Sequence, residues 1–152
     1  MRIRPATPAD RSELPALHTA TVEAFGPEAY DQSTVEAWAK AGERTPSDYV
    51  TDNTEHFTVA IKNDDIVGFG HLIPEKSAVH AVYVHPDHAR TGVGSALLAE
   101  LEGYARGCGC EELSLQASLN AVGFYEQAGY TAVEAVDLDG IRVCEMTKAL
   151  CV

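Results

Sequence analysis

Hydrophobic and polar residues change their period along the chain, and these changes predict a succession of strands and helices. Apolar residues recur at helical spacing from Leu14 to Phe25 and from Leu97 to Ala105. Leu113, Leu115 and Ala117 instead alternate with other residues, as on one face of a strand. The predicted strands lie around Ile3 and at 56–62, 66–73, 78–84, 113–117, 131–137 and 141–148; the predicted helices cover 7–25, 33–41 (ended by Gly42), the run from the glycines at 92 and 94 to Gly107, and 120–128.

Local residues mark where several of these elements begin and end. Thr7, Pro8 and Asp10 are typical of a helix start, because threonine caps free amides, proline suits the first turn and an acid favours the positive end of the helix dipole. Turns at Asn63–Asp65 and Asp139–Gly140 predict two β-hairpins.

Length and composition predict one folded domain over residues 1–152, since a domain typically holds about 100 to 200 residues. The opening decapeptide reaches polar and proline residues too early for a secretion signal, and no stretch approaches the roughly 18 apolar residues of a membrane span. Four cysteines lack the Cys-x-x-Cys spacing of zinc and redox sites. We therefore expect a cytoplasmic protein with reduced thiols, no metal and no membrane association.

The charge balance is strongly acidic. Lysine and arginine total 11 against 23 aspartates and glutamates, a formal net charge of -12. Such a charge argues against a general nucleic-acid binder. Few of the basic residues are lysines, so the composition suggests either a halophilic protein adapted to high salt or simply a soluble acidic protein.

The segment from Val82 to Ser95 passes from a strand through a short loop into a helix, with glycines at 92 and 94. Glycines at a helix start let the backbone approach a ligand, and the free amides there favour phosphate oxygens. A dinucleotide fingerprint would need glycine where Leu97 stands, and no Gly-Lys-Ser/Thr phosphate loop occurs. The segment therefore predicts an anion site of another kind, or a tight turn that holds no ligand.

Two motifs in this region resemble the GCN5-related N-acetyltransferase (GNAT) superfamily. Its pyrophosphate signature, Gln/Arg-x-x-Gly-x-Gly/Ala, falls on Ala89–Gly94, with alanine at the first position and Arg90 able to compensate from the next. Its Asn-x-x-x-x-Phe-Tyr-x-x-x-Gly-Phe/Tyr segment falls on Asn120–Tyr130. The resemblance implies an α/β (α+β) fold with a mixed, mostly antiparallel sheet flanked by helices, in which two strands splay at the acetyl-CoA site.

The same resemblance implies the residues that bind acetyl-CoA as cosubstrate. The free backbone of the splayed strand would pair with the pantetheine arm, and the Val84 amide near the acetyl carbonyl would stabilise the oxyanion of acyl transfer. The pyrophosphate would lie on the Arg90–Ser95 turn. The implied binding residues are Val82, Tyr83, Val84, Ala89, Arg90, Thr91, Gly92, Val93, Gly94, Ser95, Asn120 and Tyr125.

Transfer to an amine needs an acid for the departing thiolate and a base for the nitrogen. Tyr125 matches the tyrosine that similar enzymes place beside the sulfur, although an aromatic packing role would also explain it. His80 shares a strand face with Ala78, Val82 and Val84 and has the position of the histidine in arylalkylamine N-acetyltransferases, so it is the candidate base or a structural histidine. Reserve candidates are Glu75, His71, His18 and a water chain; His18 otherwise fits a buried core histidine.

The sequence thus predicts an N-acetyltransferase that moves an acetyl group from acetyl-CoA directly to a small-molecule amine. An acetyl-CoA-binding sensor without transfer activity is the alternative. The segment Tyr30–Trp38 is similar to a Tyr-x-x-x-Gln-x-x-Ala-Trp pattern of small bacterial acetyltransferases, which makes the two opening helices the acceptor wall; Trp38 by itself favours a core position. A homodimer is compatible with these features, and the acceptor stays open, with the negative charge favouring a cation.

Overall fold

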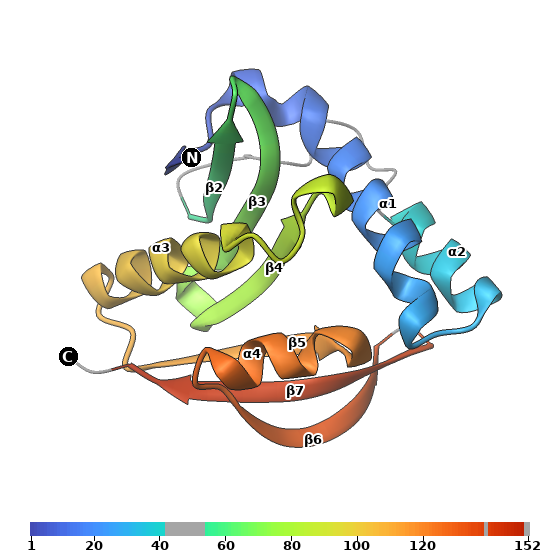
Figure 1. The fold of residues 1–152 in the computed structure, drawn as a ribbon. Helices are drawn as coiled ribbons and strands as arrows, with labels where there is room; N and C mark the ends of the chain where they lie inside the picture. Colours follow the sequence, from blue (N-terminus) through green and yellow to red (C-terminus); the bar gives the residue numbers. More distant parts are fainter. Residues whose placement is uncertain (42–53, 139, 151–152) are drawn as a thin grey trace.

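One seven-stranded sheet forms the centre of the protein, in a computed structural model that describes residues 1–41, 54–138 and 140–150 (Figure 1). The strand order is β1-β2-β3-β4-β5-β7-β6, and every neighbouring pair is antiparallel except β4 and β5. This confirms the predicted mixed, mostly antiparallel sheet. The strands are β1 (Arg2–Pro5), β2 (His56–Lys62), β3 (Asp65–Ile73), β4 (Ala78–Val84), β5 (Glu112–Ser118), β6 (Thr131–Leu138) and β7 (Ile141–Ala149).

The parallel pair β4 and β5 separates soon after it begins. Only Ala78 with Ser114 and Val79 with Leu115 are in register, and the remaining residues of β4 pair with β3 alone. Figure 1 shows the sheet dividing at this point into one part that holds β2 to β4 and another that holds β5 to β7. The predicted splay of two strands is therefore confirmed, and it opens the middle of the sheet.

The helices cover both faces of the divided sheet. Helix α1 (Leu14–Phe25) packs its leucines against β2 and β3 on one face, with α2 (Gln32–Ala41) beside it. Helices α3 (Val93–Gly107) and α4 (Val122–Gln127) pack on the opposite face over a larger apolar cluster. None of the described helices is long and apolar enough to cross a membrane.

The first helix begins differently from the prediction. Residues Pro8–Glu13 form a 3₁₀ segment, and the α-helix starts only at Leu14. Pro15 explains the break, because it has no amide to continue a helical ladder from the preceding turn and is tolerated only in a first turn. Asp10 still acts at the start: its carboxylate accepts the Thr7 amide at 2.8 Å and pairs with Arg4.

Turn predictions agree with the backbone where the structure describes it. Asn63 and Asp64 both have positive φ angles, 52° and 67°, between paired residues Lys62 and Asp65. Two such residues in succession form the two-residue hairpin turn whose twist matches the strands. The predicted helix end at Gly42 and the residue 139 of the second turn lie outside the described residues.

The expectation that His80, Val82 and Val84 share one face of β4 is wrong. The register passes from Ala81 opposite His71 to Val79 opposite Leu72, so β4 carries one extra residue, a β-bulge, at His80. A bulge changes which side chains face which side of a sheet. Val82 and Val84 pack toward α3, whereas the His80 ring lies beside His71 on the face where α1 packs.

Candidate active site

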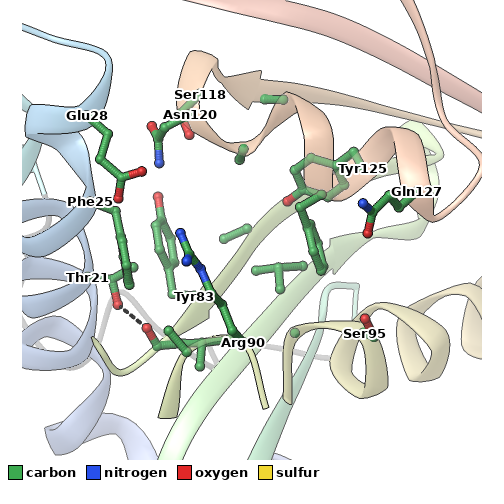
Figure 2. A pocket seen from close by; sticks show the side chains of 18 of the residues that line it. Thr21, Phe25, Glu28, Tyr83, Arg90, Ser95, Ser118, Asn120, Tyr125 and Gln127 are labelled. Atoms are coloured by element: carbon green, nitrogen blue, oxygen red, sulfur yellow. Dashed lines mark hydrogen bonds between the residues drawn. The ribbon is translucent and has the colours of Figure 1, made fainter. Parts of the chain in front are cut away.

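A cavity of about 660 Å³ occupies the gap between β4 and β5 (Figure 2). Its volume is within the usual range of small-molecule sites. The sequence-predicted residues Val82, Tyr83, Val84, Ala89, Arg90, Gly92, Gly94, Ser95, Asn120 and Tyr125 line it, together with His80. The structure therefore gathers ten of the twelve implied binding residues, which the sequence spreads over more than forty positions, around one space.

The other two residues of that set have different surroundings. Val93 is buried against Leu97 and Ala60 in the core beneath the helix. Thr91 donates its hydroxyl to the His88 carbonyl at 2.5 Å and so closes the loop on itself. Neither side chain lines the cavity, and only their backbone amides belong to the turn.

The turn before α3 is shaped by two residues with left-handed backbone. Arg90 has φ 60°, and Gly92, the N-cap of α3, has φ 89°. The carbonyl of Gly92 accepts the first hydrogen bond of the helix, from the Ala96 amide. The amides before Ala96 in the first turn therefore have no acceptor within the helix. Amides at the positive end of a helix dipole favour anions, and these lie at the edge of the cavity.

The two glycines of the turn serve different purposes. A Cβ on Gly92 would meet no protein atom within 4 Å, so its positive φ is what requires glycine. A Cβ on Gly94 would lie 3.2 Å from the Phe124 ring, so this glycine lets α4 approach α3. The space in front of Gly92 is open toward a ligand, whereas the space at Gly94 is filled by protein.

The backbone of β4 faces the cavity at alternate residues. The His85 amide donates to the Val67 carbonyl of β3 at 2.8 Å, and register places Tyr83 in the same kind of hydrogen-bonded pair. In an antiparallel ladder the residues between such pairs direct their amides and carbonyls to the other side. The amides of Val82 and Val84 therefore point into the gap left by β5, and the Thr21 hydroxyl donates to the Val84 carbonyl at 3.0 Å.

Tyr125 reaches the cavity from α4. Its ring is buried among Phe124, Tyr130 and the apolar cluster, and Figure 2 shows its hydroxyl directed toward the centre of the cavity. Burial, with a smaller contribution from Tyr83, raises the pKa of this phenol well above its ordinary value. The hydroxyl therefore stays protonated at neutral pH.

Asn120 contributes a polar atom that the protein leaves unsatisfied. Its buried side-chain oxygen has no hydrogen-bond partner within the described part of the chain. Buried polar atoms are normally paired, so an exception calls for an explanation. In Figure 2 the nitrogen of the Asn120 amide is directed toward the Tyr83 hydroxyl, and the oxygen is turned the other way.

A second cavity, of about 640 Å³, opens on the other side of the splay, next to α1 and α2. His18, His71 and His80 line it. The His18 ring meets the Tyr83 ring edge-on at 4.7 Å, and His71 accepts or donates a 2.5 Å hydrogen bond with Glu55. The reserve candidate Glu75 is exposed and lines neither cavity. The residues common to both cavities are Trp38, His80, Ala81, Tyr83, Gln116 and Ser118.

Sequence reasoning missed two contacts that close this arrangement. The Tyr30 hydroxyl donates to the Arg142 carbonyl at 2.5 Å and accepts the Leu119 amide at 2.9 Å, which ties the α1–α2 connection to β7. Trp38 packs edge-on against Tyr30 at 5.7 Å and lines both cavities, so it is a wall residue as well as a core residue. The Tyr30–Trp38 motif was the available signal.

No cluster of three or more potential metal ligands of the His, Cys, Asp or Glu types occurs in 1–41, 54–138 and 140–150. The groups that line the two cavities differ. Those groups are backbone amides on one side of the splay and histidine and aromatic side chains on the other.

Comparison with known proteins gives the class. The family model for the acetyltransferase (GNAT) domain matches residues 26–150, which include most of the residues that line both cavities. The chain belongs to this family, and it is an acyltransferase by the same evidence. This confirms the family that the Ala89–Gly94 and Asn120–Tyr130 motifs indicated.

Particular relatives agree with that assignment. The chain is 29% identical over 134 residues to the uncharacterized N-acetyltransferase YafP of Escherichia coli (strain K12), covering 88% of this chain and 83% of YafP. A crystal structure of a GCN5-related N-acetyltransferase from Rhodopseudomonas palustris is similar with a TM-score of 0.89 and 29% identity, covering 98% of this chain and 95% of that one. The PaiA N-acetyltransferase of Thermoplasma acidophilum, solved in complex with coenzyme A, shares the fold with a TM-score of 0.78 at 22% identity, over 97% and 98% of the chains.

Proposed function

We propose that this protein transfers the acetyl group of acetyl-CoA directly to a small amine, with donor and acceptor entering from opposite sides of the splayed sheet. The observation that carries the proposal is the meeting of two cavities between β4 and β5, at residues that include His80 and Tyr83. A binding module for one ligand would need only one of these spaces. Two spaces that meet at one point suit a reaction between two substrates.

The first cavity suits the donor. The open amides of the Arg90–Ser95 turn would hold the pyrophosphate, and the Val82 amide would pair with the pantetheine arm. The side-chain nitrogen of Asn120, which is directed toward the Tyr83 hydroxyl at the cavity wall, offers that arm a donor. The complex of the PaiA relative with coenzyme A supports a coenzyme A donor in this fold.

The transfer step assigns one proton to each of two side chains. The amine nitrogen attacks the thioester carbonyl carbon, the carbon–sulfur bond breaks, and the products are the acetamide and free coenzyme A thiol. The nitrogen loses a proton, which His80 would accept, and the departing thiolate gains one, which Tyr125 would donate. A backbone amide of β4, at Val84, would stabilise the oxyanion that forms between these events.

The environment of Tyr125 is compatible with an acid, although its phenol is weakly acidic. Burial raises the pKa of Tyr125 because it disfavours the phenolate. The same desolvation would disfavour a thiolate released beside it and raise the pKa of that thiol. Because both pKa values rise in the same surroundings, burial does not by itself prevent proton donation from the phenol to the thiolate.

His80 lies at the junction of the cavities, as a base must. Its ring is 4.8 Å from that of His71, which is hydrogen-bonded to Glu55, so a second histidine could pass the proton onward. The bulge in β4 is what directs His80 to the α1 face. His71, His18 and a water chain are the remaining alternatives for the base.

The test is thiol release from acetyl-CoA with a panel of amines, combined with direct binding of acetyl-CoA by calorimetry. Gly92→Val should weaken acetyl-CoA binding by about tenfold or more, because a β-branched residue at φ 89° costs roughly 1 to 3 kcal/mol and fills the open space of the turn. Gly103→Val, an exposed position of the same helix with nothing within 4 Å, is the matched control and should bind normally.

Two outcomes would contradict the proposal. Unchanged affinity in a Gly92→Val variant that melts as a folded protein would show that the pyrophosphate lies elsewhere. Binding of acetyl-CoA without thiol release for any amine would favour the sensor alternative over an active transferase.

A further inference from the structure

The second cavity differs in composition from the surface around it. The chain has 23 acidic residues, yet among the described residues that line this cavity Glu145 is the one carboxylate, and Lys76 offsets its charge. Most of the other walls are aromatic or aliphatic, including Trp38, Phe69 and Ile141. The acidic surface can attract cations in general, but the cavity itself is close to neutral.

The neighbouring cavity does not change this balance. Its described carboxylate, Glu28, shares the space with Arg90, and Figure 2 shows the Arg90 guanidinium extending toward the same region as Glu28 and the Tyr83 ring. The histidines at 18, 71 and 80 add no negative charge, and the Glu55 carboxylate behind His71 is hydrogen-bonded to that ring and lines neither cavity. Among residues 1–41, 54–138 and 140–150, the junction where the amine would react therefore offers few unpaired carboxylates.

Charge and shape together define an acceptor class. An ammonium group that leaves water needs a carboxylate or several acceptors, and each uncompensated charge is costly. A polyamine or an aminoglycoside carries several ammonium groups, for which the described walls provide too few partners. Aromatic and aliphatic walls instead stabilise an apolar body in proportion to the area that leaves water.

We propose that the acceptor is a primary monoamine with an apolar, aromatic-sized body, and that polyamines and aminoglycosides are poor substrates. This inference rests on the proposed function. The ring of the acceptor lies against Trp38 and the aliphatic residues of β7, and its amine lies at the junction beside His80. Glu145 is the one described carboxylate available to attract the ammonium form before it loses its proton.

The sole tryptophan of the chain offers a direct measurement, because Trp38 is part of the cavity wall. In the presence of coenzyme A, 2-phenylethylamine should give a saturable change in tryptophan fluorescence at a concentration at least tenfold below any change caused by spermidine or kanamycin. Turnover with acetyl-CoA should show the same order, with kcat/KM for 2-phenylethylamine about 10- to 100-fold higher.

A specificity change sharpens the test. Ile141→Asp adds a carboxylate to the cavity wall and should lower kcat/KM for 2-phenylethylamine by about tenfold while it raises that for spermidine. Val133→Asp makes the same kind of replacement on the exposed strand β6 of the same hairpin, outside both cavities, and should leave both values within twofold.

The outcomes separate the two proposals. Preference for spermidine or kanamycin in binding and turnover overturns the inference and leaves the transferase intact. Absence of any saturable fluorescence change with 2-phenylethylamine also overturns it. Saturable binding of 2-phenylethylamine, weaker binding of the polycations and no acetyl transfer supports the cavity assignment and contradicts the proposed function instead.

Discussion

Two tyrosines five residues apart, Tyr125 and Tyr130, are both buried and both have raised pKa values, but their hydroxyls are in different situations. Tyr130 donates to Glu102 at 2.9 Å in a closed network, in which Lys148 also reaches Glu102 at 3.0 Å and the Ala128 carbonyl at 2.8 Å. The Tyr125 hydroxyl faces the cavity between the splayed strands.

The difference shows that burial alone does not identify a catalytic group. Burial raises the pKa of both phenols, and for Tyr130 the hydrogen bond to Glu102 adds to the effect. A hydroxyl that already has an anionic partner stabilises the fold and is not available to a substrate. A hydroxyl that faces an open space is available. Removing the hydroxyl from each tyrosine in turn, by substitution with phenylalanine, tests this distinction.

Tyr125→Phe should have the largest effect. We expect acetyl-CoA binding to be retained and acetyl transfer to slow by about 10²- to 10⁴-fold, the usual contribution of a positioned proton donor. Single-turnover rates and calorimetry measure the two properties separately. Turnover at the parent rate would mean that Tyr125 only packs the short helix.

His80→Ala should have the next largest effect, and it should depend on pH. At neutral pH an amine acceptor is mostly protonated, so loss of the base should slow transfer by about 10²-fold or more. The loss should shrink as pH rises and free amine becomes abundant. A profile of kcat/KM against pH checks this; parent activity at every pH would make His80 structural and favour His71 or water.

Tyr130→Phe removes the same hydroxyl from the closed network and should affect stability instead of chemistry. Glu102 loses one of its donors while Lys148 remains, so we expect the free energy of unfolding to fall by roughly 1 to 3 kcal/mol. Denaturant unfolding measures this loss. The transfer rate of folded enzyme should stay within about twofold, and a 10²-fold loss would contradict the comparison.

The smallest effect concerns alkaline stability. Both phenols have pKa values above the ordinary value of 10.0, so the folded state holds protons that the unfolded state releases as pH rises beyond it. The contribution of the two phenols to the free energy of unfolding should therefore be complete below about pH 10. Above that pH it should fall by about 1.4 kcal/mol per pH unit for each phenol. Denaturant midpoints between pH 9 and 11 should fall less steeply in Tyr130→Phe than in the parent.

Much of the fold could be predicted from local sequence. Helix and strand periodicity located the described elements, because apolar residues at the spacings of 3.6 and 2 must face a core whatever the topology. Asn63 and Asp64 predicted a tight hairpin because both residue types tolerate left-handed backbone. The start of α1 was missed because Thr7, Pro8 and Asp10 mark the start of a 3₁₀ segment, whereas the apolar helical spacing itself begins at Leu14.

The candidate site was predictable only in part. The glycine turn and the Asn120–Tyr130 segment are local motifs, and the structure brings most of their residues to one cavity. The side of the sheet on which His80 lies was not predictable, since it depends on a bulge set by pairing with β3. Tyr30 forms its closing contacts with partners 89 and 112 residues away, and Trp38 becomes a cavity wall only in the folded chain.

By itself, the sequence determined the family, the order of elements and the glycine turn, because each depends on residues close together along the chain. The tertiary structure alone decided that β4 and β5 separate after two residue pairs and that Tyr125 is open while Tyr130 is closed. These features depend on which distant groups meet. The residue type determines which hydrogen bonds a side chain can donate or accept. Only the folded structure determines whether another protein group already forms that hydrogen bond.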